Sequence, residues 1–386
     1  MLSSKGHVCI FTSAHPVDDV RVNSKVAASL LERGFEVSWV GPAVSHFTDS
    51  VRRDPRINYV LIPSNHSRLD RLRSSRKVAR AAKELPSVDW WYSPDPDAAA
   101  SVVRIAKRRG GKVVFDIHEI FHGAVLERWL RGHRIGLVRE LVRRRIAHTC
   151  RRSDLVIGVS GSVLRPYLCA DDKTVVVRNC APRWFAADKA EASDRVDREM
   201  RVMHGKVSPM NGTLVVLDAL EAAGCAAGEI KVLMSVVPGR DRSPFLASVR
   251  ERLAGSVLSG LVAIEPGVPH HEMPALLRSC DVGMIADGRG LGEDCLPNRL
   301  FEYMASGLAV LAPSYSAEIK TIIDAECVGL TADFEDPSDI ARALVWLADH
   351  PDERAEMGAR AREAFLQRHN WDIEFDRLVQ KMDAVN

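Results

Sequence analysis

Short apolar runs alternate with amphipathic stretches along the whole chain. In the first half, β-branched and aromatic runs predict strands at 7–11, 36–40, 59–62, 90–92, 112–116, 155–159 and 174–177, and helical periodicity predicts helices at 23–33, 98–109 and 137–150. After an irregular, charged stretch at 179–196 the alternation restarts, with elements at 199–204, 214–222, 231–236, 244–253, 262–264, 273–279, 282–285, 299–304, 309–312, 327–331 and 337–350, and a helical end from 351 onward. Strands that alternate with helices are typical of doubly wound parallel sheets, which bind ligands at the carboxyl ends of their strands. The pattern therefore predicts two α/β domains that face each other across a cleft.

The length and composition fit this prediction. The chain has 386 residues, of which 46% are hydrophobic and 27% charged, and these values exclude a disordered or fibrous protein. No apolar stretch approaches the roughly 18 residues that span a bilayer, and the first residues lack the features of a signal peptide. The eight cysteines show no C-x-x-C spacing, which indicates reduced thiols and no metal site. We therefore expect a cytoplasmic protein.

The charge is distributed unevenly. Residues 1–185 contain 32 Lys and Arg against 18 Asp and Glu, whereas the remainder contains 21 against 33. Basic residues concentrate at 68–83 and at 128–152, where nine arginines alternate with apolar residues at helical spacing. This spacing is typical of a helix on an anionic membrane surface, and a solvated basic face is the alternative. No nucleic-acid-binding module surrounds these segments, so nucleic acid is not expected as a partner.

The segment 287–307 carries the most chemical information. Three glycines within 288–292 follow a predicted strand and allow backbone N–H groups to turn toward an anion. Pro297 suits the first position of a helix, whose N-terminus favours a negative charge. Glu302 lies one turn after Asn298 on the same helix face, where its carboxylate would accept hydrogen bonds from hydroxyl groups. A sugar nucleotide offers this combination, a diphosphate between two polyols; a purely structural carboxylate is the alternative for Glu302.

The same segment resembles a known signature. Asp294-x7-Glu302, within Leu-Pro-Asn-Arg-Leu-Phe-Glu-Tyr-Met-Ala-Ser-Gly at 296–307, resembles the Glu-x7-Glu motif of the retaining glycosyltransferases of family 4, which have the two-domain GT-B fold. The stretches at 116–119, 153–160, 177–179 and 266–282 resemble further family segments in the same order. The resemblance implies a GT-B enzyme with an N-terminal acceptor-binding domain at 1–185, a nucleotide-sugar-binding domain at 186–366, and a final helix at 367–386 that returns to the first domain.

The resemblance also implies roles for individual residues. Glu302 would bind the donor ribose, Asp294 the transferred sugar, and His118 the sugar near its anomeric centre from across the cleft. Gly205 and Lys206 stand where the family holds the diphosphate with a cation. The implied donor-binding set is Gly205, Lys206, Asn211, Gly267, Val268, Asp294, Asn298, Arg299, Leu300 and Glu302, and the catalytic candidates are His118, Lys206, Asp294 and Glu302.

Two positions depart from the family pattern. Asn211 stands where a second cation is usual, and Asp294 stands where a longer glutamate is usual. Arg299 or Arg289 could supply the missing positive charge. The shorter Asp294 could accommodate a different donor sugar.

The acceptor side is expected on loops after the N-terminal strands. Its candidates are His15, Asp19, Arg21 and Glu119. A basic first half suits a glycan or lipid-linked acceptor and a polysaccharide pathway on the inner face of the plasma membrane. The expected donor is a UDP- or GDP-sugar, with no cofactor and no metal.

Three functions remain open at this point. A retaining transferase needs no protein nucleophile, because the departing diphosphate can take the acceptor proton. An inverting transferase or a nucleotide-sugar epimerase would need Asp116 or Glu119 as a base. A binding protein that has lost catalysis would explain Asn211 and Asp294.

Overall fold

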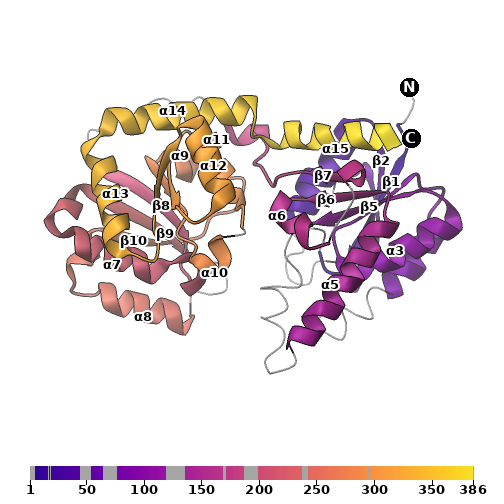
Figure 1. Cartoon of the computed structure of the whole chain (residues 1–386), viewed down its shortest axis with the longest axis horizontal. Helices are drawn as coiled ribbons and strands as arrows, with labels where there is room; N and C mark the ends of the chain where they lie inside the picture. The colour runs from indigo at the N-terminus through magenta and orange to yellow at the C-terminus, as the bar shows by residue number, and fades with distance from the viewer. Residues whose placement is uncertain are drawn as a thin grey trace. The chain divides into compact units, whose positions relative to one another are not determined.

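The chain folds into two compact α/β units, each built on a parallel sheet (Figure 1). Unit 1 comprises Met1–Asn179 and Asp372–Asn386, and unit 2 comprises Cys180–Trp371. The computed structural model describes residues 5–15, 17, 19–43, 54–63, 76–118, 135–167, 171–186, 199–236, 242–293 and 295–385. Two parallel sheets in one chain are the architecture that the alternation of strands and helices predicts.

Unit 1 contains a seven-stranded sheet in the order β3-β2-β1-β4-β5-β6-β7. Its strands are β1 (His7–Phe11), β2 (Glu36–Pro42), β3 (Ile57–Ile62), β4 (Trp90–Ser93), β5 (Lys112–Ile117), β6 (Leu155–Gly158) and β7 (Thr174–Val176). Its helices include a π-helical turn (Val20–Ala27) that continues into α1 (Ala28–Glu32), and α3 (Pro96–Arg109), α5 (Ile135–Arg152) and α6 (Gly161–Leu164). The strand order reverses between β1 and β4, and doubly wound sheets bind ligands at the loops that follow the strands at such a reversal.

Unit 2 contains a six-stranded sheet in the order β10-β9-β8-β11-β12-β13. Its strands are β8 (Met200–Lys206), β9 (Ile230–Val236), β10 (Val262–Pro266), β11 (Val282–Met284), β12 (Ala309–Pro313) and β13 (Gly329–Ala332). Its helices include α7 (Thr213–Ala223), α8 (Pro244–Leu253), α9 (Met273–Arg278), α10 (Arg289–Gly292), α11 (Asn298–Ala305), α12 (Ala317–Glu326), α13 (Pro337–Asp349) and α14 (Pro351–Gln367). Here the strand order reverses between β8 and β11.

Helices cover both faces of the unit 2 sheet. Along β12, Ala309 and Leu311 pack into one apolar cluster with α7 and α13, while Val310 and Ala312 pack into another with α11, α12 and α14. Successive side chains of a strand point to opposite faces, and both faces of this strand are buried. A near-continuous apolar run such as β12 is typical of a parallel sheet that is covered on both sides.

The boundary between the units lies earlier than the sequence pattern placed it. The stretch that follows Asn179 is not only a linker, because Arg183–Ala186 forms a short 3₁₀ helix. Phe185 and Ala186 are buried in the core of unit 2, so the first residues of this stretch belong to that unit.

The last helix, α15 (Trp371–Val385), packs on unit 1, which agrees with the expected return of the chain. Glu374 is fully buried and accepts a hydrogen bond from the backbone N–H of Arg178 at 2.9 Å. The Arg33 guanidinium lies 5.0 Å above the Phe375 ring and pairs with Asp376 at 2.7 Å. Trp371, the first residue of the helix, is buried in unit 2, as expected of a packing residue.

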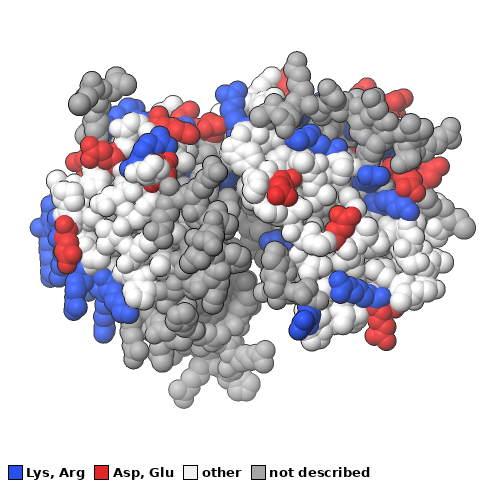
Figure 2. All heavy atoms as spheres, turned by 180° about the vertical axis from the view of Figure 1, so that it is seen from behind, with Lys and Arg blue, Asp and Glu red and all other residues white. Residues whose placement is uncertain are grey.

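Helix α5 carries part of the second basic segment. It exposes Leu137 and Leu141, and Arg145 follows one turn later on the same face. On the face of unit 1 drawn in Figure 2, Lys and Arg side chains gather along one edge. Among the helices that the structure describes, none is both long and apolar enough to cross a membrane.

Candidate functional site

Helix α11 presents the donor motif. Pro297 caps this helix in an extended conformation, with φ −74° and ψ 143°, so it precedes the helix instead of occupying its first position as expected. Leu300 and Met304 are buried in the core of unit 2, and this fixes one face of the helix inward. Asn298 and Glu302 therefore lie one turn apart on the half-buried face.

Glu302 is held by two donors on one of its oxygens. The side-chain amide of Asn298 donates to Oε1, and Nε2 of His270 lies 3.1 Å from the same atom. The second oxygen, Oε2, has no partner among the described residues, and the side chain is 12% exposed. A carboxylate fixed in this way can accept hydrogen bonds from a hydroxyl-bearing ligand at Oε2.

Two aromatic residues surround His270. The ring of Phe185, which is buried, lies 5.3 Å from the imidazole, and the ring of Trp184 lies 5.8 Å from it at 87°. Trp184 is 47% exposed although its neighbour Phe185 is buried. Our sequence analysis missed His270 and Trp184; the only signal was that His270 closely follows Gly267 and Val268, two residues of the implied donor-binding set.

The carboxyl end of β8 meets α11. Gly205 adopts φ +93°, and a Cβ atom added to it would lie 3.5 Å from Nη1 of Arg299 and 3.8 Å from the Tyr303 hydroxyl. Lys206, the last residue of β8, follows and is exposed, and its side chain forms no hydrogen bond or ion pair with the part of the chain that the structure describes. Lys206 is thus a cation available at the point where the strand order reverses.

Asp287, just after β11, organises the polar residues near this point. Its Oδ1 accepts the side-chain amide of Asn211 at 2.9 Å and the guanidinium of Arg299, and the Tyr315 hydroxyl donates to its backbone oxygen at 2.7 Å. Arg289, the other candidate for a replacement cation, lies 3.5 Å from Asp333. Both arginines therefore already face carboxylates, and Asn211 serves a structural contact.

His204 is fully buried, and its charged neighbours are Arg299 and Asp287. Its Nε2 is 3.2 Å from the Thr213 hydroxyl. Burial and the nearby Arg299 charge lower the pKa of His204 to about 3, although Asp287 acts in the opposite direction. His204 is therefore neutral and adds no positive charge to the site.

The other donor-set residues lie as follows. The side chain of Leu300 is fully buried, so this residue could meet a ligand only through its backbone. The N–H of Gly267 donates to the Val236 carbonyl at 2.9 Å, and Val268 is half-buried. The glycine-rich stretch forms the single turn of α10, in which the N–H of Gly292 donates to the Gly288 carbonyl, so it is not the open anion-binding bend that we expected. Asp294 lies outside the described residues.

In unit 1, two histidines meet at the carboxyl ends of the central strands. The rings of His15 and His118 lie 5.0 Å apart in an edge-to-face arrangement. Nδ1 of His15 is 3.0 Å from Oδ1 of the fully buried Asp95, whose Oδ2 accepts hydrogen bonds from Thr12 and from the backbone N–H of Ser13. The structure therefore brings His15 and His118 together.

Other acceptor-side candidates are used inside unit 1. Oδ1 of Asp19 accepts the backbone N–H of Val22 at 2.8 Å and thereby caps the helix that follows. Arg21 is buried and forms two hydrogen bonds with Asp116. Burial opposes the charge of Asp116, but Arg21, His118 and the hydrogen bonds from Arg21 and Tyr92 prevail and lower the pKa of this carboxyl. Asp116 is thus a fully buried, paired carboxylate and is poorly suited to act as a base; Glu119 lies outside the described residues.

Comparison with known families identifies the chain. Residues 20–181 match the family model described as Glycosyltransferase Family 4, and residues 241–380 match a model described as Glycosyl transferase-like. This chain is a family 4-type glycosyltransferase. No curated protein shows significant sequence similarity to it.

Solved structures share the GT-B fold of this glycosyltransferase. HepE of Anabaena, solved with UDP, is 14% identical with a TM-score of 0.72, and the match covers 98% of this chain and 100% of HepE. A glycosyltransferase from Rickettsia africae is 16% identical with a TM-score of 0.73 and 99% of both chains covered. Sucrose-phosphate synthase from Thermosynechococcus elongatus is 16% identical with a TM-score of 0.70, over 98% of this chain and 99% of the other. HepE has also been solved with UDP-glucose.

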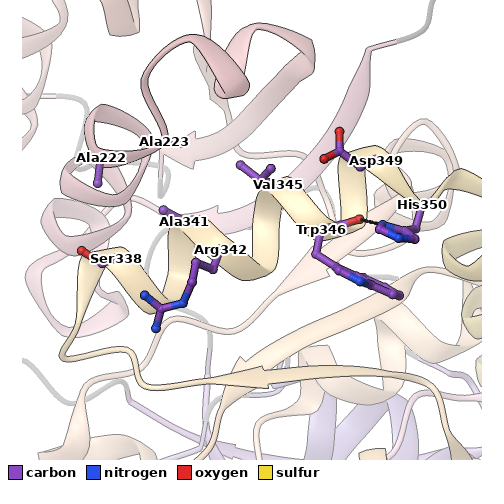
Figure 3. Close-up of a pocket in the computed structure, with 9 residues that line it drawn as sticks. All are labelled: Ala222, Ala223, Ser338, Ala341, Arg342, Val345, Trp346, Asp349 and His350. Atoms are coloured by element: carbon purple, nitrogen blue, oxygen red, sulfur yellow. Dashed lines mark hydrogen bonds between the residues drawn. The ribbon is translucent and has the colours of Figure 1, made fainter.

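The glycosyltransferase also has an open cavity of about 490 Å³ away from these residues (Figure 3). It lies between the end of α7 and α13 and contains none of the residues considered above. Its lining is Ala222, Ala223, Ser338, Ala341, Arg342, Val345, Trp346, Asp349 and His350. The rings of Trp346 and His350 stack 4.2 Å apart, and Nδ1 of His350 contacts the Trp346 carbonyl at 2.8 Å, so these two residues are engaged with each other.

Proposed function

We propose that this glycosyltransferase transfers a sugar from a nucleotide-diphosphate sugar to a glycan, lipid-linked or small-molecule acceptor, with retention of anomeric configuration. The observation that carries the proposal is how the two carboxylate oxygens of Glu302 are hydrogen-bonded. Its Oε1 is occupied by Asn298 and His270, whereas Oε2 has no partner among the residues described in unit 2. A carboxylate arranged in this way accepts hydrogen bonds from the ribose diol of a nucleotide.

Lys206 provides the charge that the reaction needs. Glycosyl transfer builds positive charge on the sugar and negative charge on the departing diphosphate. A cation fixed near the leaving group lowers the barrier because it interacts more strongly with the transition state than with the bound donor. Lys206 is exposed at the carboxyl end of β8 and is the cation that we assign to the diphosphate.

A uridine nucleotide is the first donor to test, with GDP-sugars next. HepE, a relative in fold, has been solved with UDP and with UDP-glucose. Burial of Asp116 against Arg21 makes this carboxylate poorly suited to act as an inverting base, and this favours retention over an inverting mechanism that uses Asp116. Glu119, the other candidate base, lies outside the described residues. His15 and His118 are the residues that we assign to the acceptor and to the donor sugar.

Turnover of the donor tests this function. The wild type should release UDP from UDP-glucose or another UDP-sugar, and Glu302→Gln and Lys206→Ala should each lower kcat/KM at least about 10-fold, the loss expected for a charge-assisted hydrogen bond. Glu272→Gln is the matched control, since this exposed glutamate lies two residues after His270. NMR of the sugar first released should show the anomer of the donor. Turnover that survives both substitutions would refute the site.

We also propose that α5 docks the enzyme on an anionic membrane surface, in a polysaccharide or glycolipid pathway at the inner face of the membrane. Leu137 is 67% exposed and Leu141 is 57% exposed, and Arg145 continues the same helix face. Apolar side chains beside arginines suit the boundary between lipid headgroups and acyl chains.

Vesicle flotation tests the docking separately from catalysis. The wild type should float with vesicles that contain phosphatidylglycerol, and Leu137→Ser with Leu141→Ser, or Arg145→Glu, should abolish flotation. Val257→Ser in unit 2 is the control, because it removes an apolar side chain that is 80% exposed elsewhere. Equal flotation of all variants would end the proposal.

A further inference from the structure

His270 lies where it can control the orientation of Glu302. The two residues are 32 positions apart and come from different elements, the loop after β10 and helix α11. Nε2 of His270 lies 3.1 Å from Oε1 of Glu302, while the Asn298 amide reaches the same oxygen from one turn earlier. Asn298 acts along the helix and His270 acts from outside it, so the carboxylate is held from two directions.

The proton on His270 follows from this contact. A carboxylate oxygen accepts hydrogen bonds, so Nε2 must carry a proton for the contact to be attractive. The imidazole is therefore either the neutral tautomer protonated on Nε2 or the imidazolium. In both forms it donates to Oε1 and leaves the lone pairs of Oε2 for a ligand.

The aromatic neighbours fix the plane of the imidazole. The rings of Phe185 and Trp184 lie 5.3 Å and 5.8 Å from the ring of His270. The Phe185 and Trp184 rings lie 5.1 Å from each other. The imidazole is 29% exposed, so it is packed on part of its surface but remains open to a ligand. A donor with a fixed ring plane loses less conformational entropy when it forms a hydrogen bond.

We propose that His270 is a positioning residue for the donor ribose, holding Glu302 in the rotamer in which Oε2 accepts the ribose hydroxyls. The inference rests on the proposed function, since it names the residue that makes Glu302 competent. Without His270, Glu302 keeps only the Asn298 contact, and its carboxylate can rotate away from the diol. The consequence is specific to ribose hydroxyls and leaves contacts with the base and the diphosphate unchanged.

Ligands with and without the diol test this role. Calorimetry should show that the wild type binds UDP at least about 10-fold more tightly than 2′,3′-dideoxy-UDP, because the dideoxy ligand offers no hydroxyl to Oε2 of Glu302. His270→Phe keeps an aromatic ring against Trp184 and Phe185 but removes the donor. It should weaken UDP binding about 10-fold and leave binding of 2′,3′-dideoxy-UDP unchanged.

Matched variants separate positioning from folding. His271→Phe should change neither affinity, because His271 is 77% exposed and contacts Glu272 instead of Glu302. His270→Gln retains a donor of similar reach and should restore part of the preference for UDP. In a Glu302→Gln background, His270→Phe should add little further loss, since the two residues act through one contact.

The outcomes distinguish this inference from the proposed function. A wild type that binds none of UDP, GDP, ADP and dTDP would overturn both. A wild type that prefers UDP to 2′,3′-dideoxy-UDP, together with a His270→Phe variant of unchanged preference and wild-type melting temperature, would overturn the role of His270 alone. If GDP binds in place of UDP, the same comparison is made with GDP and 2′,3′-dideoxy-GDP.

Discussion

Arg21 and Asp116 form a buried ion pair with two hydrogen bonds, from Nε at 3.2 Å and from Nη2 at 3.1 Å. The Tyr92 hydroxyl also donates to the same carboxylate, and all three side chains are buried. The pair joins the end of β5, two residues before His118, to the helix that follows the loop containing His15.

Removing one partner of this pair should be costly. Arg21→Met leaves a buried carboxylate without its counter-charge, and we expect the free energy of unfolding of unit 1 to fall by about 3–5 kcal/mol. Urea unfolding measures this loss. Adding Asp116→Asn to Arg21→Met should recover part of the loss, because the uncompensated charge is then gone. Arg56→Met, in an exposed pair with Asp54, should leave stability nearly unchanged, because solvent screens such a pair. Equal losses for the two arginine variants would contradict the prediction.

The contact between Glu374 and Arg178 should hold α15 on unit 1. Glu374 is fully buried and accepts the backbone N–H of Arg178, its guanidinium at 3.4 Å, and the guanidinium of Arg377 at 2.6 Å. Glu374→Gln should lower stability by about 1.5–3 kcal/mol, since it removes charge-assisted hydrogen bonds. Amide hydrogen exchange across α15 should accelerate. Asp383→Asn, at an exposed position of the same helix, should leave exchange nearly unchanged, and a similar effect of both variants would rule out the assigned role.

The sequence predicted the architecture well because buried parallel strands are visible as apolar runs. Such runs mark β1 and β6 within one residue of their observed ends. Prediction of helix starts was less accurate. The first helical segment begins at Val20, three residues before the expected start, because Asp19 caps it through the Val22 N–H.

Contacts between distant residues could not be predicted. The sequence shows Asn211 only as a residue that stands where a cation is usual. In the structure its amide donates a hydrogen bond to Asp287, 76 positions later. Trp184 fell within a charged stretch that suggested a linker, and only the burial of Phe185 beside it shows that this stretch packs on unit 2. Such pairings depend on how the elements pack, which spacing along one element does not encode.

Gly283 should be essential for the position of α11. A Cβ atom added to this β11 residue would lie 2.2 Å from Cγ of the buried Tyr303, so strand and helix would have to separate. Gly283→Ala should cost about 1–3 kcal/mol through overpacking and should weaken nucleotide binding, because α11 carries Glu302. Thermal unfolding and UDP titration measure the two effects. Gly260→Ala has no heavy atom within 4 Å of the added carbon and should be neutral; a neutral Gly283→Ala would show that this packing is not tight.

His204 should make the stability of unit 2 sensitive to acid. Burial and the Arg299 charge hold its pKa at about 3 in the folded chain, against an ordinary value of 6.5. Below pH 6.5 the unfolded chain therefore binds a proton that the folded chain does not, and stability falls as the pH decreases. Linkage sets the slope for one such group at about 1.4 kcal/mol per pH unit between roughly pH 6 and 4.

His204→Gln should remove this component. Urea unfolding at pH 7, 6 and 5 should give a shallower loss of stability for the variant than for the wild type, with the difference growing by about 1.4 kcal/mol from pH 6 to pH 5. His271→Gln, at an exposed histidine, should keep the wild-type slope. The substitution also alters the contact with Thr213, which shifts the free energy of unfolding by the same amount at each pH. The slopes of stability against pH are therefore compared instead of the stabilities themselves. Parallel curves for wild type and His204→Gln would mean that His204 takes up its proton equally in the folded and unfolded chain.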